Sequence, residues 1–315
     1  MPEILITEFM DPDAVELLRS TCDVAYDADL WSNEDKLRQS VDDIAALIVR
    51  NRTQVTADLL DKAPNLKVVG RLGVGLDNID LKACDERGVV VHPATGANAN
   101  SVAEYVIASA LILVRAGAYH AAPRLVSGAW PREELACGGE VAGRTLGIIG
   151  LGSVGSTVAR KAAALDLNII AHDPHLPDDH DNWSLAQRVS LDAVLTSSDI
   201  VTLHGPLSSE TSGMIGEAQI ATMKPGACLI NSARGGMVDH DALVAALRSG
   251  QLCGAAIDVF EDEPISAEAG RLFEGIENVI LTPHISGVTH EANHRVSFLT
   301  AHNVAAELGV ELNVK

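Results

Sequence analysis

The chain has 315 residues, of which 47% are hydrophobic and 21% are charged, a balance typical of a globular protein large enough for two domains. Its 43 acidic and 23 basic residues give a net charge of −20, which argues against nucleic acid or an anionic membrane as a partner. Five cysteines without C-x-x-C spacing favour reduced thiols in a cytoplasm, and the acidic start MPEILITEF is predicted to be a strand and not a signal peptide.

The first third of the chain alternates short apolar runs with helical segments. We expect strands at residues 3–7, 45–49, 67–70 and 89–92. A helix is expected from Asp11-Pro12 to about Arg19, where aspartate caps and proline opens the first turn, and further helices are expected near Ser32, Thr56 and Asp80. This alternation indicates a parallel sheet covered by helices.

Residues 101–118 form the most apolar helical segment of the chain. Glu104, Ser109 and Arg115 interrupt it, so it is too polar to span a membrane. We expect it to be buried between domains or between subunits, with a helix at about 121–127 continuing the same surface. This segment is the reason to expect a homodimer.

Strands recur through the rest of the chain. They are expected at residues 145–149, 168–171, 200–203, 227–230, 255–259 and 279–281. A final helix, at about 289–308, is expected to return to the first domain. The predicted fold class is therefore α/β, with two doubly wound parallel-sheet domains. A Rossmann NAD-binding domain of residues 98–285 is inserted into a flavodoxin-like substrate-binding domain of residues 1–97 and 286–315, and the active site is expected in the cleft between them.

The most informative stretch is the glycine turn of Gly150, Gly152 and Gly155, which has G-x-G-x-x-G spacing between a predicted strand and a predicted helix. Gly150 permits the tight turn, Gly152 leaves room for a pyrophosphate, and Gly155 lets the helix pack closely on the strand. The first amides of the helix have no intrahelical partner, so they suit a diphosphate. The pattern predicts a dinucleotide site.

Asp173 follows the next strand, where a carboxylate accepts hydrogen bonds from a ribose 2′-hydroxyl. It would repel a 2′-phosphate, and no arginine follows to bind one, so NAD is favoured over NADP. Residues 172–183 also contain three histidines and several acids. Because they lack a fixed ligand spacing, we interpret this tract as a solvated loop and expect no metal site.

Three segments near the carboxyl ends of later strands supply groups for chemistry: NSARGGMVD, DVFEDEP and TPHISG. They contain Arg234, Glu263 and His284 respectively. Oxidation of an alcohol by a nicotinamide needs a base for the hydroxyl proton, a cation for a carboxylate or carbonyl oxygen, and a group that tunes the base. A carboxylate beside an imidazole favours the charged imidazole, so the histidine can donate a proton when a keto acid is reduced.

These segments, together with RLGVGLDNID, NANSVAEY and GLGSVG, resemble the D-isomer-specific 2-hydroxyacid dehydrogenases in order and spacing, over essentially the whole chain. The resemblance implies that Arg234 binds the substrate carboxylate and polarises the carbonyl, that His284 is the acid/base, and that Glu263 is its charged partner. It also implies that Asp258 holds the nicotinamide carboxamide. The cofactor-binding residues expected beside the glycine turn and Asp173 are Ser101, Ser153, Val154, His204, Pro206, Thr211, Ser232, Ala233, Asp258 and Gly287. His204 can equally be a hydrogen-bonded structural histidine.

The substrate is expected to be a small anionic 2-hydroxy or 2-keto acid. The predicted substrate-binding residues are Arg50, Arg52, Arg71, Val74, Gly75, Asn98 and Arg132. The resemblance makes Val74 and Gly75 backbone contacts to the carboxylate, and it places Arg50, Arg71 and Arg132 where phosphoglycerate dehydrogenases hold cations around a phosphate. As a set, these arginines suggest a second anion on the substrate.

Within the family, LITEFMD, LIVRNRTQVT, WPRE and PHISGVTHEANHRVS look closest to the (S)-sulfolactate dehydrogenases. A sulfonate would use the same arginines as a phosphate, and (S)-sulfolactate has the D arrangement. The alternatives are 3-phosphoglycerate dehydrogenase and a hydroxypyruvate or glyoxylate reductase. The sequence ends at Lys315, so the regulatory extension of many phosphoglycerate dehydrogenases is not expected.

Two other functions fit the pattern less well. Formate dehydrogenases of this superfamily have glutamine where Glu263 stands. An NAD-sensing corepressor on the same fold is a binding protein of a different class, and the catalytic trio argues only weakly against it.

Overall fold

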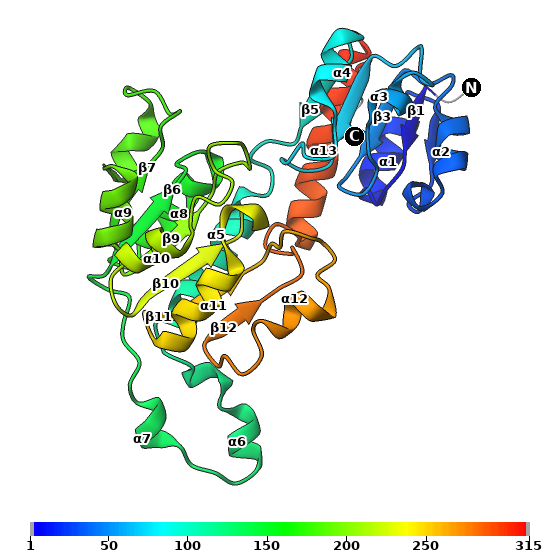
Figure 1. Ribbon diagram of the computed structural model, residues 1–315. Helices are drawn as coiled ribbons and strands as arrows, with labels where there is room; N and C mark the ends of the chain where they lie inside the picture. Colours follow the sequence, from blue (N-terminus) through cyan, green and yellow to red (C-terminus); the bar gives the residue numbers. More distant parts are fainter. Residues whose placement is uncertain (1–2, 313–315) are drawn as a thin grey trace. The chain divides into compact units, whose positions relative to one another are not determined.

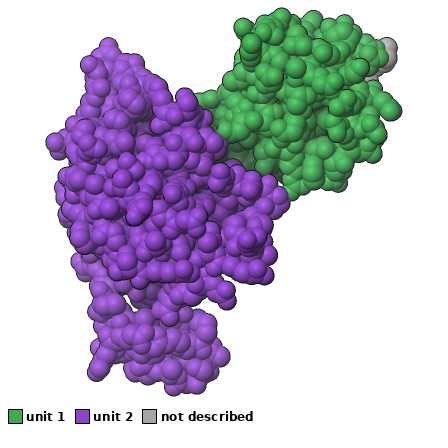
Figure 2. Space-filling model, viewed as in Figure 1, with its two compact units in different colours: residues 1–98, 288–315 green, residues 99–287 purple. Residues whose placement is uncertain are grey.

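The structure is a computed structural model that describes residues 3–312, and it divides into two compact units, coloured separately in Figure 2. Unit 1 comprises the chain up to Asn98 and from Val288 onward, and unit 2 comprises Ala99–Gly287. The expected domain boundaries, after residues 97 and 285, lie one and two residues before these divisions. The outer ends of the predicted substrate-binding domain, residues 1–2 and 313–315, lie outside the described residues.

Unit 1 is built on a parallel sheet (Figure 1). Its strands are β1 (Ile4–Ile6), β2 (Val24–Tyr26), β3 (Ala46–Val49), β4 (Val68–Arg71) and β5 (Val90–Pro93). Its helices are α1 (Pro12–Arg19), α2 (Glu34–Ser40), α3 (Ala57–Leu60), α4 (Leu81–Glu86) and α13 (His290–Glu307), with a 3₁₀ turn η1 (Leu30–Ser32). The strand order β2-β1-β3-β4-β5 is the flavodoxin-like order. The edge strand β2 was not predicted, because its apolar run, Val24–Tyr26, is only three residues long and is flanked by aspartates.

The helix starts of unit 1 follow their capping residues. Asp11 accepts a hydrogen bond from the Asp13 amide and precedes the proline that opens α1. Thr56 and Asp80 cap α3 and α4 in the same way. The last helix, α13, closes this core. It approaches β4 so closely that a Cβ on Gly70 would lie 2.5 Å from a Val304 methyl carbon.

Unit 2 contains a second, larger parallel sheet. Its strands are β6 (Thr145–Ile149), β7 (Asn168–His172), β8 (Gln187–Arg188), β9 (Ile200–Leu203), β10 (Ala227–Asn231), β11 (Leu252–Ile257) and β12 (Val279–Leu281). Its α-helices are α5 (Ala99–Leu113), α6 (Ala122–Val126), α7 (Arg132–Leu135), α8 (Ser153–Ala163), α9 (Leu191–Ser197), α10 (Glu217–Thr222), α11 (His240–Ser249) and α12 (Ala267–Arg271). Three 3₁₀ turns are η2 (Ala118–His120), η3 (Asp181–Leu185) and η4 (Gly235–Met237).

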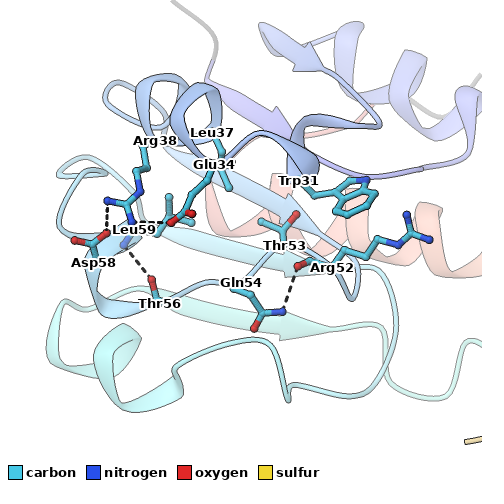
Figure 3. Close-up of a pocket in the computed structure, with 10 residues that line it drawn as sticks. All are labelled: Trp31, Glu34, Leu37, Arg38, Arg52, Thr53, Gln54, Thr56, Asp58 and Leu59. Carbon is cyan, nitrogen blue, oxygen red and sulfur yellow. Dashed lines mark hydrogen bonds and ion pairs between the residues drawn. The ribbon is translucent and has the colours of Figure 1, made fainter. Parts of the chain in front are cut away.

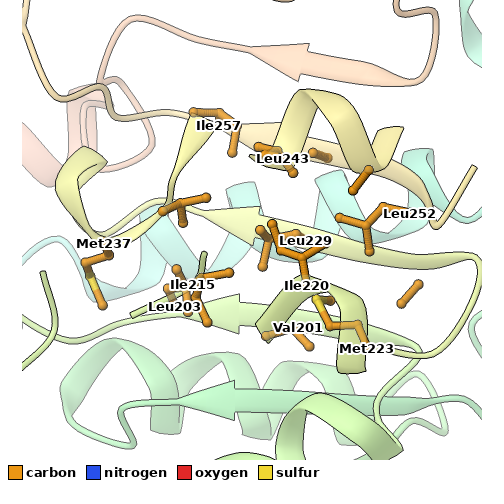
Figure 4. Close-up of a cluster of buried hydrophobic side chains, with 14 of the residues drawn as sticks. Val201, Leu203, Ile215, Ile220, Met223, Leu229, Met237, Leu243, Leu252 and Ile257 are labelled. Atoms are coloured by element: carbon orange, nitrogen blue, oxygen red, sulfur yellow. The ribbon is translucent and has the colours of Figure 1, made fainter. Parts of the chain in front are cut away.

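The strand order of unit 2 is β12-β11-β10-β9-β6-β7-β8, with the chain running outward from β6 in both directions. This is a doubly wound sheet, as predicted. Both faces are covered, which explains why its strands read as continuous apolar runs. Figure 4 shows one face, where Val201, Leu229 and Ile257 from neighbouring strands pack with Ile220 of α10 and Leu243 of α11.

Helix α5 differs from the prediction in length and in role. It ends at Leu113, before the predicted end at residue 118. Its apolar residues Val102, Val106, Ala110 and Leu113 are buried in the core of unit 2 with the side chains of β6 and α8. The expectation that this helix is buried between domains or between subunits is therefore wrong for these side chains, which pack within unit 2.

The segment after α5 instead projects from unit 2. Residues 118–140, called the arm below, carry η2, α6 and α7 and extend away from the sheet (Figures 1 and 2). The arm exposes large apolar side chains, among them Val126 at 89% and Trp130 at 79%. No single helix among residues 3–312 has the length and hydropathy to cross a bilayer; α5 followed by Ala118–Val126 meets those two criteria only as a pair bent by 88°.

Candidate active site

The glycine turn joins β6 to α8 in unit 2. Gly150 has φ +94°, and a Cβ there would lie 2.9 Å from the His204 carbonyl carbon. A Cβ on Gly155 would lie 2.0 Å from the Gly150 oxygen. Around Gly152, which precedes α8, an added Cβ would meet nothing within 4 Å, and no side chain caps the helix there. The first backbone amides of α8, at Ser153 and Val154, therefore lie next to free space at Gly152. Uncapped amides beside free space can bind a diphosphate.

Asp173 follows β7 and ties it to this turn. Its Oδ2 accepts the Leu151 amide at 2.8 Å, and its Oδ1 accepts the amides of His175 and Leu176 at 3.0 and 3.1 Å. Oδ2 keeps one lone pair for a further donor, so the carboxylate can still accept a ribose hydroxyl. The sequence predicted only the ribose contact and missed this structural one.

His204 directly follows β9 beside the turn and is half-buried. Burial lowers its pKa to about 3, so the ring is neutral near pH 7, and its Nε2 lies 3.0 Å from the Thr202 hydroxyl. Of the two interpretations of His204, the structure favours the hydrogen-bonded one. In the loop that follows, the Thr211 hydroxyl donates to the Pro206 carbonyl at 2.7 Å and accepts the Ser208 amide at 2.8 Å.

The three candidate catalytic residues come together at the carboxyl ends of β10, β11 and β12. The His284 Nδ1 lies 2.7 Å from Glu263 Oε2, and Glu263 Oε1 accepts the Phe260 amide at 3.0 Å. Arg234 donates from Nη1 to the Ala233 carbonyl at 2.6 Å. Because Nδ1 is engaged by the carboxylate, the other ring nitrogen of His284 is the one that can face a substrate.

Glu263 is the charged member of this group near neutral pH. Burial acts to raise its pKa, but hydrogen bonds from His284 and the Phe260 amide, with the charges of His284 and Arg234, together lower the pKa below its ordinary value. The influence of Arg234 indicates that its guanidinium lies near the pair. An arginine, an imidazole and a carboxylate therefore form one electrostatic cluster in unit 2.

Asp258 is fully buried and binds the segment that carries His284. Its Oδ1 accepts the Thr282 hydroxyl at 2.6 Å and the Ile285 amide at 2.8 Å, and its Oδ2 accepts the Ser286 amide at 2.8 Å. Only Oδ2 keeps a lone pair for another donor such as a carboxamide. The resemblance implied the carboxamide contact and gave no sign of the three internal ones.

Further predicted cofactor residues lie in unit 2. The Ser232 hydroxyl follows β10 and is buried without a hydrogen-bond partner among residues 3–312, so it can accept or donate to a ligand. Ala233 beside it is buried, and Ser101 is buried on α5. Gly287 is the last residue of the unit.

The predicted substrate arginines of unit 1 differ in their surroundings. Arg50 follows β3 and Arg71 ends β4, and these adjacent parallel strands bring both to one edge of the sheet. Arg50 donates to Asn293 Oδ1 of α13 at 2.8 Å, and burial lowers its pKa against the opposing charge of Glu8. Arg71 passes directly over Gly73, where a Cβ would lie 1.6 Å from Arg71 Nη1.

Arg52 has other neighbours. Its guanidinium stacks 4.3 Å from the centre of the Trp31 ring, and it lines a pocket with Thr53, Gln54 and Arg38 (Figure 3). In that pocket Arg38 is paired with Glu34 and Asp58. Of the remaining predictions, Val74 is exposed on the loop after β4, next to Gly75, and Asn98 Oδ1 is buried without a partner among residues 3–312. Arg132 is exposed on α7 of the arm.

Sequence reasoning missed Glu8 altogether. This residue directly follows β1 and is only 3% exposed. Its carboxylate accepts the four consecutive amides of residues 50–53 at 2.8 to 3.2 Å. The sequence signal that could have identified it is an acidic residue directly after an apolar strand. A carboxylate that is buried there must accept hydrogen bonds from nearby donors.

A doubly wound sheet, a glycine turn followed by a carboxylate with a lone pair left for a further donor, and an arginine–carboxylate–histidine cluster at the strand ends are typical of a nicotinamide-dependent dehydrogenase. Comparison with known proteins gives the same class. Residues 107–286 match the family model of the D-isomer specific 2-hydroxyacid dehydrogenase, NAD binding domain. The chain belongs to the D-isomer-specific 2-hydroxyacid dehydrogenase family, and it is an NAD-dependent oxidoreductase that acts on the CH–OH group of a 2-hydroxy acid.

Individual relatives span the chain. It is 48% identical to an (S)-sulfolactate dehydrogenase of Chromohalobacter salexigens, over 98% of this chain and 99% of that one. It is 38% identical to a D-3-phosphoglycerate dehydrogenase of Archaeoglobus fulgidus, over 96% of this chain but only 56% of the relative. The crystal structure of D-lactate dehydrogenase from Aquifex aeolicus complexed with NAD and lactic acid superposes with a TM-score of 0.85 at 30% identity, covering 97% of this chain and 95% of that one.

Proposed function

We propose that the chain interconverts (S)-3-sulfolactate and 3-sulfopyruvate, with Arg234, Glu263 and His284 as the catalytic residues. The observation that carries the catalytic assignment is the 2.7 Å contact between His284 Nδ1 and Glu263 Oε2, with the charge of Arg234 beside it. This arrangement supplies the base, the tuning carboxylate and the cation that the chemistry needs.

Each residue has a defined part in the reaction. NAD, when bound, would supply the acceptor for the hydride that leaves C2 of the hydroxy acid. His284 takes the hydroxyl proton on the ring nitrogen that does not contact Glu263, and in the reverse direction it returns that proton to the carbonyl oxygen. Glu263 stabilises the protonated ring, and Arg234 binds the carboxylate of the substrate.

The cofactor contacts follow from the groups that are available in unit 2. The amides at Ser153 and Val154 bind the diphosphate beyond Gly152, and Asp173 accepts a ribose hydroxyl with its remaining lone pair. The Ser232 hydroxyl, which has no partner among the described residues, and the remaining lone pair of Asp258 bind polar groups toward the nicotinamide.

The sulfonate assignment rests on the relative that is 48% identical over nearly the full length of both chains, and on Arg50 and Arg71 at one edge of the sheet of unit 1. A substrate with two anionic groups needs a cationic side chain for each of them. Arg234 is proposed for the carboxylate, and Arg50 and Arg71 are proposed for the second anion. D-3-phosphoglycerate dehydrogenase is the second candidate, since a relative of that name is 38% identical.

The test compares kcat/KM for 3-sulfopyruvate, phosphohydroxypyruvate and hydroxypyruvate with NADH. We expect 3-sulfopyruvate to give the highest value, and a higher value for phosphohydroxypyruvate would transfer the assignment to the second candidate. Arg71→Gln should lower kcat/KM at least tenfold for the two doubly anionic acids and much less for hydroxypyruvate. An equal loss for all three would contradict the role of the arginines.

The catalytic assignment has its own test. His284→Ala should lower kcat by about three orders of magnitude, the range of general acid–base catalysis, while NADH still binds with nearly unchanged affinity by fluorescence titration. Turnover like that of the wild type would remove His284 from the mechanism.

We further propose a homodimer in the cytoplasm. The exposed apolar side chains of the arm support the dimer, in place of the α5 face considered from the sequence. The five cysteines all have free thiols, and their odd number favours a reducing compartment.

A further inference from the structure

The turn that carries His284 has an unusual backbone. His284 has φ +55°, in the left-handed region that only a few per cent of residues other than glycine adopt. Such a residue costs about 1–2 kcal/mol and persists only where the surroundings enforce it. The position needs an imidazole for the proposed chemistry, so glycine cannot relieve the strain.

Asp258 supplies the surroundings that hold this turn. Besides the three bonds to its carboxylate, its backbone carbonyl accepts the His284 amide at 2.7 Å. One buried residue thus binds four donors of the segment 282–286. The Asp258 amide itself donates to the carbonyl of Asn231, the last residue of β10, at 2.9 Å. Asp258 therefore connects the segment 282–286 to the sheet.

The orientation of the Asp258 carboxylate depends on a chain of hydroxyls. Thr282 gives its only hydroxyl hydrogen to Asp258 Oδ1, at 2.6 Å. The Tyr105 hydroxyl, which lies 2.8 Å from the same Thr282 oxygen, must therefore be the donor in that contact. Burial raises the pKa of Tyr105 and the Asp258 charge adds to this, while hydrogen bonds with Thr282 and Ser109 oppose it, with a net increase that keeps the phenol protonated.

We infer that Tyr105 and Thr282 are positioning residues for proton transfer: they fix the Asp258 carboxylate, which in turn holds His284 against Glu263. Without the Thr282 hydroxyl, Oδ1 keeps only the Ile285 amide, and the buried carboxylate must move to regain a donor. Any such movement shifts the amides of Ile285 and Ser286 and with them the His284 ring. The inference rests on the proposed role of His284 and goes beyond it by assigning two residues whose side chains do not contact the His284 ring; the only contact of Thr282 with His284 among residues 3–312 is its backbone carbonyl, which accepts the His284 amide at 3.0 Å.

The experiment uses four variants and the keto acid with the highest kcat/KM of the three above. Thr282→Val removes the hydroxyl at nearly constant shape, Thr282→Ser keeps it, and Tyr105→Phe removes only the phenol oxygen. Tyr26→Phe is the matched control, because among the described residues the Tyr26 hydroxyl has hydrogen bonds only with the Met10 backbone of unit 1, at 3.4 and 3.5 Å. We expect kcat to fall about tenfold in Thr282→Val and about threefold to tenfold in Tyr105→Phe, the rate equivalent of one hydrogen bond. Thr282→Ser and Tyr26→Phe should stay within twofold of the wild type.

Two further readouts separate positioning from simple destabilisation. The double variant Tyr105→Phe/Thr282→Val should be no slower than Thr282→Val alone, because Tyr105 acts through Thr282. The pH profile of kcat/KM should shift in Thr282→Val in the same direction as in Glu263→Gln, because both changes weaken the contact between His284 and the carboxylate. A lower melting temperature by itself would produce neither result.

The outcomes distinguish this inference from the proposed function. If His284→Ala keeps its turnover, the proposed function fails. If His284→Ala is inactive but Thr282→Val and Tyr105→Phe keep the kcat of the wild type, only the positioning inference is overturned. It is also overturned if Thr282→Ser is as slow as Thr282→Val, if the double variant is additive, or if kcat falls while the pH profile stays fixed.

Discussion

Glu8 accepts the backbone amide of Arg50 at 2.8 Å, and the same carboxylate accepts the amides of the next three residues. The loop after β3 is thus wrapped around a buried charge that belongs to the end of β1. This arrangement fixes where the Arg50 side chain starts. The bond from Arg50 to Asn293 of α13 then fixes where its guanidinium ends. Two segments distant in the sequence therefore set the position of one predicted substrate cation.

Glu8→Gln should weaken both stability and substrate binding. A glutamine side chain keeps one acceptor oxygen and turns an NH₂ group toward backbone donors, so some amides of residues 50–53 lose their partner. We expect a loss of about 1–3 kcal/mol in the free energy of unfolding by urea, together with a raised KM for the keto acid and little change in kcat. Glu16→Gln, at a surface carboxylate paired with Arg19, is the control and should change neither. An unchanged KM would mean that the loop does not position Arg50.

Gly73→Ala should act on Arg71. Gly73 has φ +147°, and the new methyl group would occupy the space of Arg71 Nη1, so the guanidinium must move. Gly88→Ala is a matched control with φ +67° and open space around the Cβ. Both variants should lose about 1 kcal/mol of stability from backbone strain. Only Gly73→Ala should raise KM for a doubly anionic keto acid, by roughly tenfold, the loss expected when about 1.4 kcal/mol of binding is removed. A similar KM in both variants would argue against Arg71 as a substrate ligand.

The half-buried ring of His204 should make folding sensitive to acid. Its pKa is about 3 in the folded chain and about 6.5 when exposed, so between these values the unfolded state binds the extra proton. Stability is therefore fully present above about pH 6.5 and is lost as the pH falls toward 3, by up to about 1.4 kcal/mol per pH unit. Urea unfolding of the cofactor-free protein at pH 7, 6 and 5 should show a smaller loss in His204→Asn than in the wild type. The exposed His175→Gln is the control, and an identical slope in all three proteins would contradict the prediction.

The arm should hold the proposed dimer together. The side chains of Val126 and Trp130 are 89% and 79% exposed, and neighbouring exposed apolar side chains of this size are typical of an interaction surface. A glutamate at each position would oppose the burial of this surface against a second chain. Light scattering should give twice the 33.1 kDa chain mass for the wild type and a single chain mass for Val126→Glu/Trp130→Glu. Leu207→Glu, at an exposed apolar residue outside the arm, should remain dimeric. A monomeric wild type would remove the proposal.

The sequence predicted most of the fold because the fold depends on local patterns. Apolar runs located β6, β9 and β12 to the residue, and capping residues located the starts of α1, α3 and α4. The short strands β2 and β8 were missed because two or three half-exposed residues carry no periodicity. Helix α5 was predicted to be longer than it is, and its apolar face was assigned to an interface. An apolar pattern indicates that a helix face is buried, but it does not indicate which part of the protein covers that face.

The candidate site divides in the same way. The sequence by itself determined the glycine turn, Asp173 and the identities of Arg234, Glu263 and His284, because the chemistry requires those residue types in a recognisable local context. Only the tertiary structure decided which buried charges hold these groups. Glu8 meets the loop after β3, and Asp258 and Tyr105 meet Thr282, through hydrogen bonds between segments far apart in the chain. Such contacts leave no local pattern, because a buried carboxylate can be satisfied by any donor that folding brings within about 3 Å.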